Sequence, residues 1–158
     1  MPAPVLVLAV GNPSRGDDAL GLHLAERLEC WLAREGIASI EVLSDMQLNI
    51  ETALDLVGRR RVLVVDASAS GDTPYACAGV SPARDHSYST HSVSPQAILQ
   101  VYRDLGLRRP PRTELLAVRG ASFELGEALS PAGRRHLETA WMFLQDWCRK
   151  AAGVTIPA

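Results

Sequence analysis

The stretch VLVLAVGNPSRGDDALG, residues 5–21, decides how the fold begins. Its continuous apolar run, Val5–Val10, is typical of a strand buried on both faces of a parallel sheet. A glycine loop follows, and from Asp18 onward the apolar residues recur at helical spacing. Strand, glycine loop and helix is how phosphate-binding folds start, yet this loop ends in two adjacent aspartates, Asp17 and Asp18. Carboxylates at a helix start repel phosphate, so the loop has the outline of a phosphate site with the charge reversed.

The same alternation of strands and helices continues along the chain. Further strands are expected at 39–43, 61–65 and 114–118, with a weaker one at 75–80. Helices are expected at 18–36, 50–57, 94–106 and from 130 to about 148, two of them opening on a Ser-Pro pair. This order predicts one α/β domain over residues 1–158. It has three layers: a mostly parallel twisted sheet of about five strands, with helices on both faces.

Composition excludes several classes of protein. The 158 residues are 47% hydrophobic and 22% charged, close to soluble globular proteins. The net charge of −2 argues against a nucleic-acid binder. The first apolar run is too short to span a membrane and lacks the basic flank of a signal peptide. Three cysteines without a CxxC motif indicate free thiols in a reducing cytosol. A cytoplasmic protein that binds neither nucleic acid nor membrane is expected.

The glycine loop fails as a nucleotide site. Gly11 and Gly16 have the spacing of a Walker loop, but Asp17 and Asp18 stand where its lysine and hydroxyl residue belong. A nucleotide- or flavin-binding domain is therefore disfavoured, and no organic cofactor is expected. The simplest structural interpretation of the two aspartates is that one of them caps the following helix.

A third aspartate, Asp66, directly follows the third predicted strand. Aspartate often forms turns at strand ends, which is the structural interpretation. In such sheets, however, ligands bind at the carboxyl ends of the strands, where Asp66 would meet the first loop. Two like charges there either share a proton or bind a cation. The segment HSYSTHS, residues 86–92, adds His86 and His91 as imidazole ligands, and an O,O,N set draws the metal preference from Mg or Mn toward Zn or Ni.

Three elements in this order, GNPSRGDDALG, VLVVDAS and STHS, resemble the hydrogenase maturation endopeptidase family. These proteases remove the C-terminal extension from the large subunit of [NiFe] hydrogenases. The resemblance implies that Asp18, Asp66 and His91 contact the metal and that Asp18 and Asp66 are catalytic. His86 is the rival imidazole. Many members have glutamate where this chain has Asp18, and Asp17 is expected to cap the helix or to support Asp18.

The resemblance also implies the partner and the metal. The partner is a [NiFe] hydrogenase large-subunit precursor, which supplies the nickel, and the protease is expected to be a monomer. Residues 44–49, SDMQLN, replace the glycine-rich turn that many members carry after the second strand. This departure leaves the substrate-facing role of the turn open. The residues Leu48–Leu54 with Gln47 suggest the subgroup that serves soluble NAD-linked hydrogenases. The alternative function is a non-catalytic metal-binding maturation chaperone with the same crevice.

Overall fold

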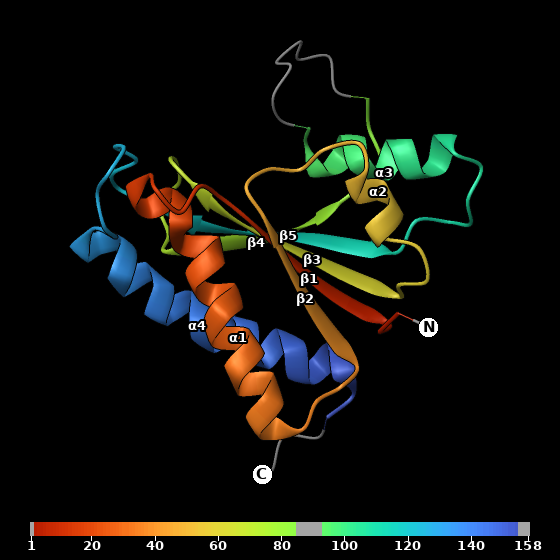
Figure 1. The fold of residues 1–158 in the computed structure, drawn as a ribbon, viewed down its shortest axis with the longest axis horizontal. Coiled ribbons are helices and arrows are strands. Elements are labelled where there is room, and N and C mark those ends of the chain that lie inside the picture. Colours follow the sequence, from red (N-terminus) through yellow and green to blue (C-terminus); the bar gives the residue numbers. More distant parts are fainter. Residues whose placement is uncertain (1, 85–92, 155–158) are drawn as a thin grey trace.

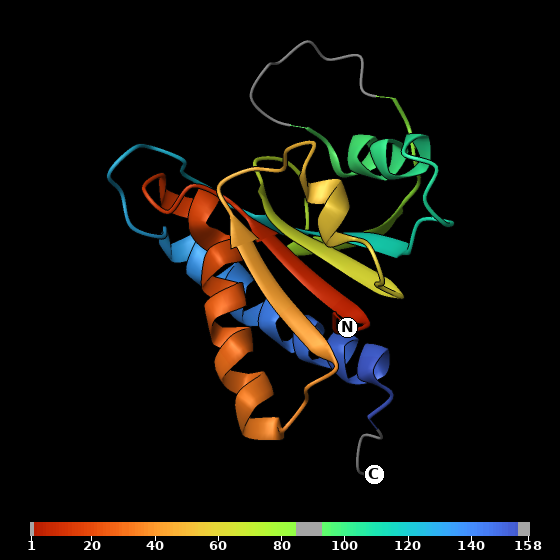
Figure 2. The same cartoon turned by 45° about the vertical axis from the view of Figure 1, so that its right-hand side comes forward.

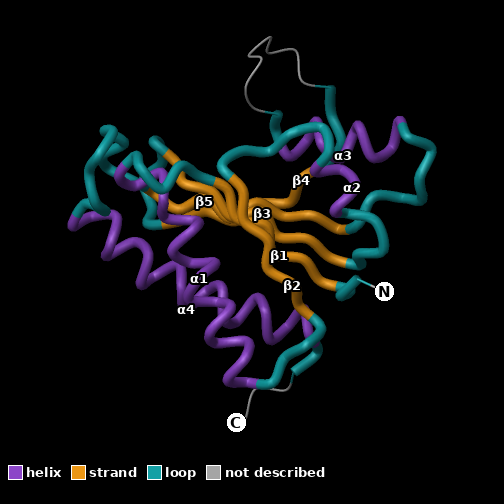
Figure 3. The backbone as a smooth tube through the Cα atoms, in the orientation of Figure 1, coloured by secondary structure: helices purple, strands orange, loops and turns teal. Residues whose placement is uncertain are grey.

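A five-stranded sheet forms the middle of three layers, as the sequence predicts (Figure 3). The computed structural model describes residues 2–84 and 93–154. The strands follow the order β2-β1-β3-β5-β4 across the sheet, and only the β4–β5 pairing is antiparallel. Their bounds are β1 Val5–Val10, β2 Ile40–Asp45, β3 Arg61–Ser68, β4 Tyr75–Val80 and β5 Arg112–Arg119.

Two helices cover each face of the sheet (Figures 1 and 2). The long helices α1, Leu20–Glu35, and α4, Pro131–Ala152, lie on one face. A short 3-10 turn, η1, at Gly16–Ala19 leads into α1. The shorter helices α2, Thr52–Asp55, and α3, Pro95–Asp104, lie on the other. None of the described helices is both long and apolar enough to cross a membrane.

The alternation of side chains along β1 divides the core in two. Its odd-numbered residues pack with α1 and α4, and its even-numbered residues pack with α2 and α3. Every residue of β1 is therefore buried, which explains why the strand reads as an unbroken apolar run. Because β1 lies between β2 and β3, the loop that follows Val10 lies at the carboxyl edge of the sheet, flanked by the ends of those two strands.

The serine caps of the two later helices are confirmed. Ser94 Oγ accepts a hydrogen bond from the Ala97 N–H (3.1 Å), and Ser130 Oγ accepts one from the Gly133 N–H (2.9 Å). Several predicted boundaries differ by a few residues, and two of the differences bear on the site. The strand predicted at 61–65 continues through Asp66 to Ser68 because β5 pairs with it that far. The helix predicted at 50–57 is regular only over Thr52–Asp55, with turns on either side.

Helix α1 approaches the sheet closely at its first turn because residue 21 is glycine. A Cβ atom at Gly21 would lie 2.8 Å from the Val65 carbonyl oxygen and 3.1 Å from that of Val10. The helix start thus sits directly on the carboxyl ends of β1 and β3. This contact brings the loop with the paired aspartates beside the end of β3.

We expect Gly21→Ala to lower the free energy of unfolding by about 1–3 kcal/mol because the new methyl group meets backbone. Without that contact, the same change in a helix would be stabilising by about 1 kcal/mol. Urea denaturation followed by circular dichroism measures the difference. Gly79→Ala on β4 is the control, since its Cβ would meet nothing within 4 Å. A stabilised Gly21→Ala protein would contradict the close approach.

Candidate active site

A cleft of about 410 Å³ opens at the carboxyl edge of the sheet, where the sequence predicts a ligand site. The ends of β1 and β3, the segments after β1 and β2, and the start of α3 form its walls. Its lining residues are Val10, Gly11, Asp18, Met46, Gln47, Leu48, Asp66, Val93, Ser94 and Pro95. The two predicted carboxylates, Asp18 and Asp66, therefore come from different elements into one cleft.

The charge of Asp18 acts on the carboxyl group of Asp66. The pKa of Asp66 is raised to about 6, mainly by burial. A hydrogen bond from the Ala67 N–H lowers this pKa, and the negative charge of Asp18 raises it. That bond joins the Ala67 nitrogen to Asp66 Oδ1 at 2.8 Å. Asp18 Oδ2 accepts from the Asn12 N–H at 2.8 Å, which ties it to the glycine loop. The cleft therefore holds a like-charge pair whose charges a cation would offset.

Both predicted imidazole ligands, His86 and His91, lie outside the described residues. In the sequence His91 stands two residues before Val93, which lines the cleft. Within residues 2–84 and 93–154, no three His, Cys, Asp or Glu side chains gather in a way that could hold a metal ion. The three-ligand site therefore stays a prediction. The structure describes two of its three proposed ligands, Asp18 and Asp66.

The expectation that Asp17 caps the helix is wrong. Neither η1 nor α1 has a side-chain hydrogen bond at its N-cap. Asp17 is fully buried and faces the loop between β5 and α4. Its carboxylate accepts bonds from the N–H groups of Ala121 (2.7 Å), Ser122 (3.1 Å) and Ser130 (2.8 Å), and from Ser130 Oγ (2.6 Å). Burial alone would raise the pKa of Asp17, but these bonds outweigh it and the pKa lies below its usual value.

Two glycines make room for this carboxylate. A Cβ atom at Gly120 would lie 2.7 Å from Asp17 Cβ, and one at Gly133 would collide with the carboxylate itself. Sequence reasoning missed this contact because the donors lie 104 to 113 residues from Asp17. Gly120 and Gly133, on either side of the 121–130 segment, are the only sequence signal of a close contact there. Glycine also occurs at helix ends and in turns, so this signal does not identify Asp17 as the partner.

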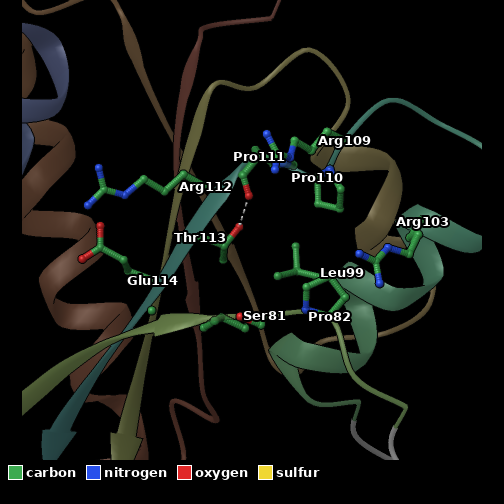
Figure 4. Close-up of a pocket in the computed structure, with 12 residues that line it drawn as sticks. Ser81, Pro82, Leu99, Arg103, Arg109, Pro110, Pro111, Arg112, Thr113 and Glu114 are labelled. Atoms are coloured by element: carbon green, nitrogen blue, oxygen red, sulfur yellow. Dashed lines mark hydrogen bonds between the residues drawn. The ribbon is translucent and has the colours of Figure 1, made fainter.

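A second, larger cavity of about 540 Å³ lies at the opposite end of the sheet, between β4, β5 and α3 (Figure 4). Arg103, Arg109 and Arg112 line it, and Thr113 Oγ1 donates to the Pro111 carbonyl at 2.9 Å. Its one carboxylate, Glu114, is paired with Arg61 at 2.8 Å. The cavity therefore holds no free acid pair, and the smaller cleft remains the candidate active site.

The fold is shared with solved hydrogenase maturation proteases. The chain is 23% identical to the hydrogenase maturating endopeptidase HybD from E. coli, with a TM-score of 0.71 over 96% of this chain and 94% of that one. It is 19% identical to the protease HycI from Thermococcus kodakarensis, with a TM-score of 0.67 over 91% of each chain. It is 21% identical to a hydrogenase 3 maturation protease, with a TM-score of 0.66 over 92% and 91%.

No protein-family model matches the chain, and no curated protein sequence matches it. At identities of 19–23%, the likeness to the solved structures establishes the fold.

We expect Asp17→Asn to lower the free energy of unfolding at pH 7 by about 2–4 kcal/mol, because an amide nitrogen then faces buried donors. Because the pKa of Asp17 is lowered in the folded protein, its carboxylate contributes its full stabilisation above about pH 4. This stabilisation is lost as the pH falls through the folded-state pKa. Denaturation at pH 7 and pH 3 should therefore show the two proteins converging in acid. Asp72→Asn, at an exposed position, is the control. Equal stability of Asp17→Asn and wild type at pH 7 would contradict the assignment.

Asp66→Asn should act in the opposite direction. Between about pH 4 and pH 6 the folded protein holds a proton on Asp66 that the unfolded chain has released, so stability falls as pH rises across this window. Removing the charge should raise the free energy of unfolding by about 1–3 kcal/mol at pH 8 and by much less at pH 4. Urea midpoints from pH 4 to 8 measure this. The exposed Asp72→Asn serves as control, and a destabilised Asp66→Asn at pH 8 would overturn the prediction.

Proposed function

We propose that this chain is an endopeptidase that removes the C-terminal extension of a [NiFe] hydrogenase large-subunit precursor after nickel insertion. The observation that carries the proposal is the meeting of Asp18 and Asp66 in one cleft at the carboxyl edge of the sheet. The shared fold with solved hydrogenase maturation proteases supports it. The subgroup serving soluble NAD-linked hydrogenases, the cytoplasmic location and the monomeric state stay predictions from the sequence.

Nickel belongs to the substrate in this proposal. Carboxylate oxygens from Asp18 and Asp66 and an imidazole nitrogen from His91 form a donor set that nickel accepts. The position of His91, two residues before the cleft residue Val93, is consistent with that role. A precursor that carries nickel would bring the positive charge that the acid pair lacks. The pair then distinguishes a loaded precursor from an empty one.

Asp66 is suited to act as general base. Before nickel arrives its pKa is about 6, so Asp66 is mostly ionised at neutral pH. A carboxylate oxygen of Asp66 that does not bind the metal would then accept the proton. A water molecule attacks the carbonyl carbon of the scissile peptide while Asp66 takes one of its protons. Asp66 then returns the proton to the leaving amine nitrogen as the carbon–nitrogen bond breaks. Nickel brought by the substrate would be held by Asp18, Asp66 and His91, and it would act as a Lewis acid on the carbonyl or the water.

None of the three described cysteines lines the cleft, and two of them, Cys77 and Cys148, carry thiols that stay protonated at neutral pH. Burial raises the pKa of the Cys77 thiol to about 11, and the nearby Glu114 carboxylate adds to this shift. Burial likewise raises the pKa of Cys148 to about 12. Neither thiol ionises at neutral pH, and a thiolate is the form that attacks a carbonyl.

A precursor assay tests the proposal. The protein is incubated with the nickel-loaded large-subunit precursor, and mass spectrometry measures the loss of a C-terminal fragment. Wild type should cleave. Asp66→Asn should reduce kcat by about 10²–10⁴-fold, the usual contribution of a general base. Asp18→Asn and His91→Ala should also impair cleavage, whereas His86→Ala and Cys77→Ser should not.

Each outcome of this assay has a distinct meaning. If wild type leaves the cognate precursor intact, the endopeptidase proposal fails; binding without truncation would indicate the maturation chaperone instead. If wild type cleaves and Asp18→Asn, Asp66→Asn and His91→Ala all cleave normally, the site is wrong although the activity is right. Loss of activity in His86→Ala alone would move the imidazole role to His86.

A further inference from the structure

The segment after β2 is apolar on both of its sides. Its inner side chains, Leu48, Ala53 and Leu56, are at most 6% exposed and pack into the core beneath α2 and α3. A surface helix normally turns polar residues toward water. Here the outer side presents four exposed apolar side chains, called the outer ridge below: Met46 (60% exposed), Ile50 (62%), Leu54 (61%) and Val57 (43%).

The clustering distinguishes this surface from the rest of the molecule. Nine large apolar side chains are exposed among the described residues, and four of them fall within the twelve positions 46–57. Single exposed apolar residues are common, but gathered ones mark interaction sites. The other five are spread over the ends of α3 and α4, the middle of α4 and the 121–130 loop.

The outer ridge begins in the candidate active site. Met46 lines the cleft together with Asp18 and Asp66, while Ile50, Leu54 and Val57 continue along the turns around α2. Figures 1 and 2 both show this segment leaving β2 at the carboxyl edge and running to α2 beside α3. A molecule that covers the ridge is therefore contiguous with whatever occupies the cleft.

Charge indicates what the occupant looks like. Positions 45–58, DMQLNIETALDLVG, contain three acids and no lysine, arginine or histidine. Asp45, Glu51 and Asp55 are all exposed around the apolar side chains. The complementary surface has an apolar centre with lysine or arginine at its rim.

We propose that the outer ridge is the docking surface for the protein substrate. It would bind a patch on the large-subunit precursor that is apolar in the centre and basic at the edge, next to the segment that enters the cleft. The inference rests on the proposed function. Four side chains are few compared with the roughly 20–30 residues per partner of a stable interface, which fits a transient enzyme–substrate contact better than a second copy of this chain.

The test compares variants of the ridge with a matched control. Ile50→Gln/Leu54→Gln removes the apolar centre while keeping side-chain length, and Glu51→Lys/Asp55→Lys reverses the rim. Met142→Gln is the control, because Met142 is 71% exposed but lies on α4, on the other face of the sheet. KM and kcat for the nickel-loaded precursor are measured at low and high salt, with Kd from biolayer interferometry and thermal melting to check folding.

Each double variant should raise KM and Kd at least about ten-fold with kcat nearly unchanged. This is the expected effect of losing contacts that are equally strong in the bound ground state and in the transition state. The charge reversal should also weaken the salt dependence of KM. If wild type binds the precursor but does not cleave it, the proposed function fails while Kd still tests the ridge. Unchanged KM and Kd in folded variants would overturn the docking inference, as would a wild type that does not bind the precursor. A wild-type dimer that Ile50→Gln/Leu54→Gln converts to monomers, with KM unchanged, would also overturn it.

Discussion

One buried carboxylate holds together the part of the fold that carries the site. Asp17 is removed from water and accepts four hydrogen bonds from a segment more than a hundred residues away. Burying an unpaired charge is costly, so these bonds are what make the position tolerable. In return they fix the start of α1 against the 121–130 loop and the N-terminus of α4. The neighbouring Asp18 is then presented to the cleft from a turn that is anchored on its other side.

The two adjacent aspartates and Asp66 show how environment separates chemically identical groups. Asp17 has four donors and a lowered pKa, whereas Asp66 has one donor, a buried setting and a charged neighbour, and its pKa is raised to about 6. The first arrangement stabilises the fold at neutral pH, and the second weakens it. A protein that keeps a destabilising acid pair at the carboxyl edge of its sheet, beside a glycine loop, has the usual profile of a functional site.

The sequence predicted what depends on local pattern. The unbroken apolar run of β1, the Ser94 and Ser130 caps and the meeting of Asp18 with Asp66 all follow from periodicity and from the carboxyl-edge rule. It missed what depends on distant partners. The donors to Asp17 come from the far end of the chain, and β3 extends past Asp66 because β5 pairs with it.

The sequence also did not predict the outer ridge, for a different reason. The sequence predicts only a short helix at 50–57, and half of the apolar side chains in this segment pack into the core. Which apolar side chains stay exposed depends on packing against elements distant in the sequence, which local pattern does not encode. Exposure of this kind becomes visible only when the three layers are assembled. Exposed apolar side chains depart from the usual pattern of a surface helix, and such departures concentrate at functional surfaces.

The acid pair and the ridge together give a physical reason why the proposed protease would wait for nickel. A partner that docks on the ridge also covers the mouth of the cleft, because Met46 belongs to both. Covering the cleft removes water from Asp18 and Asp66, and two like charges in a drier setting repel more strongly. An empty precursor would have to overcome that repulsion or force a proton onto the base. A precursor carrying a divalent ion instead neutralises the pair as it docks and leaves Asp66 ionised for proton transfer. In the proposed reaction, repulsion within the acid pair therefore offsets the favourable contacts with the ridge unless the substrate carries the metal.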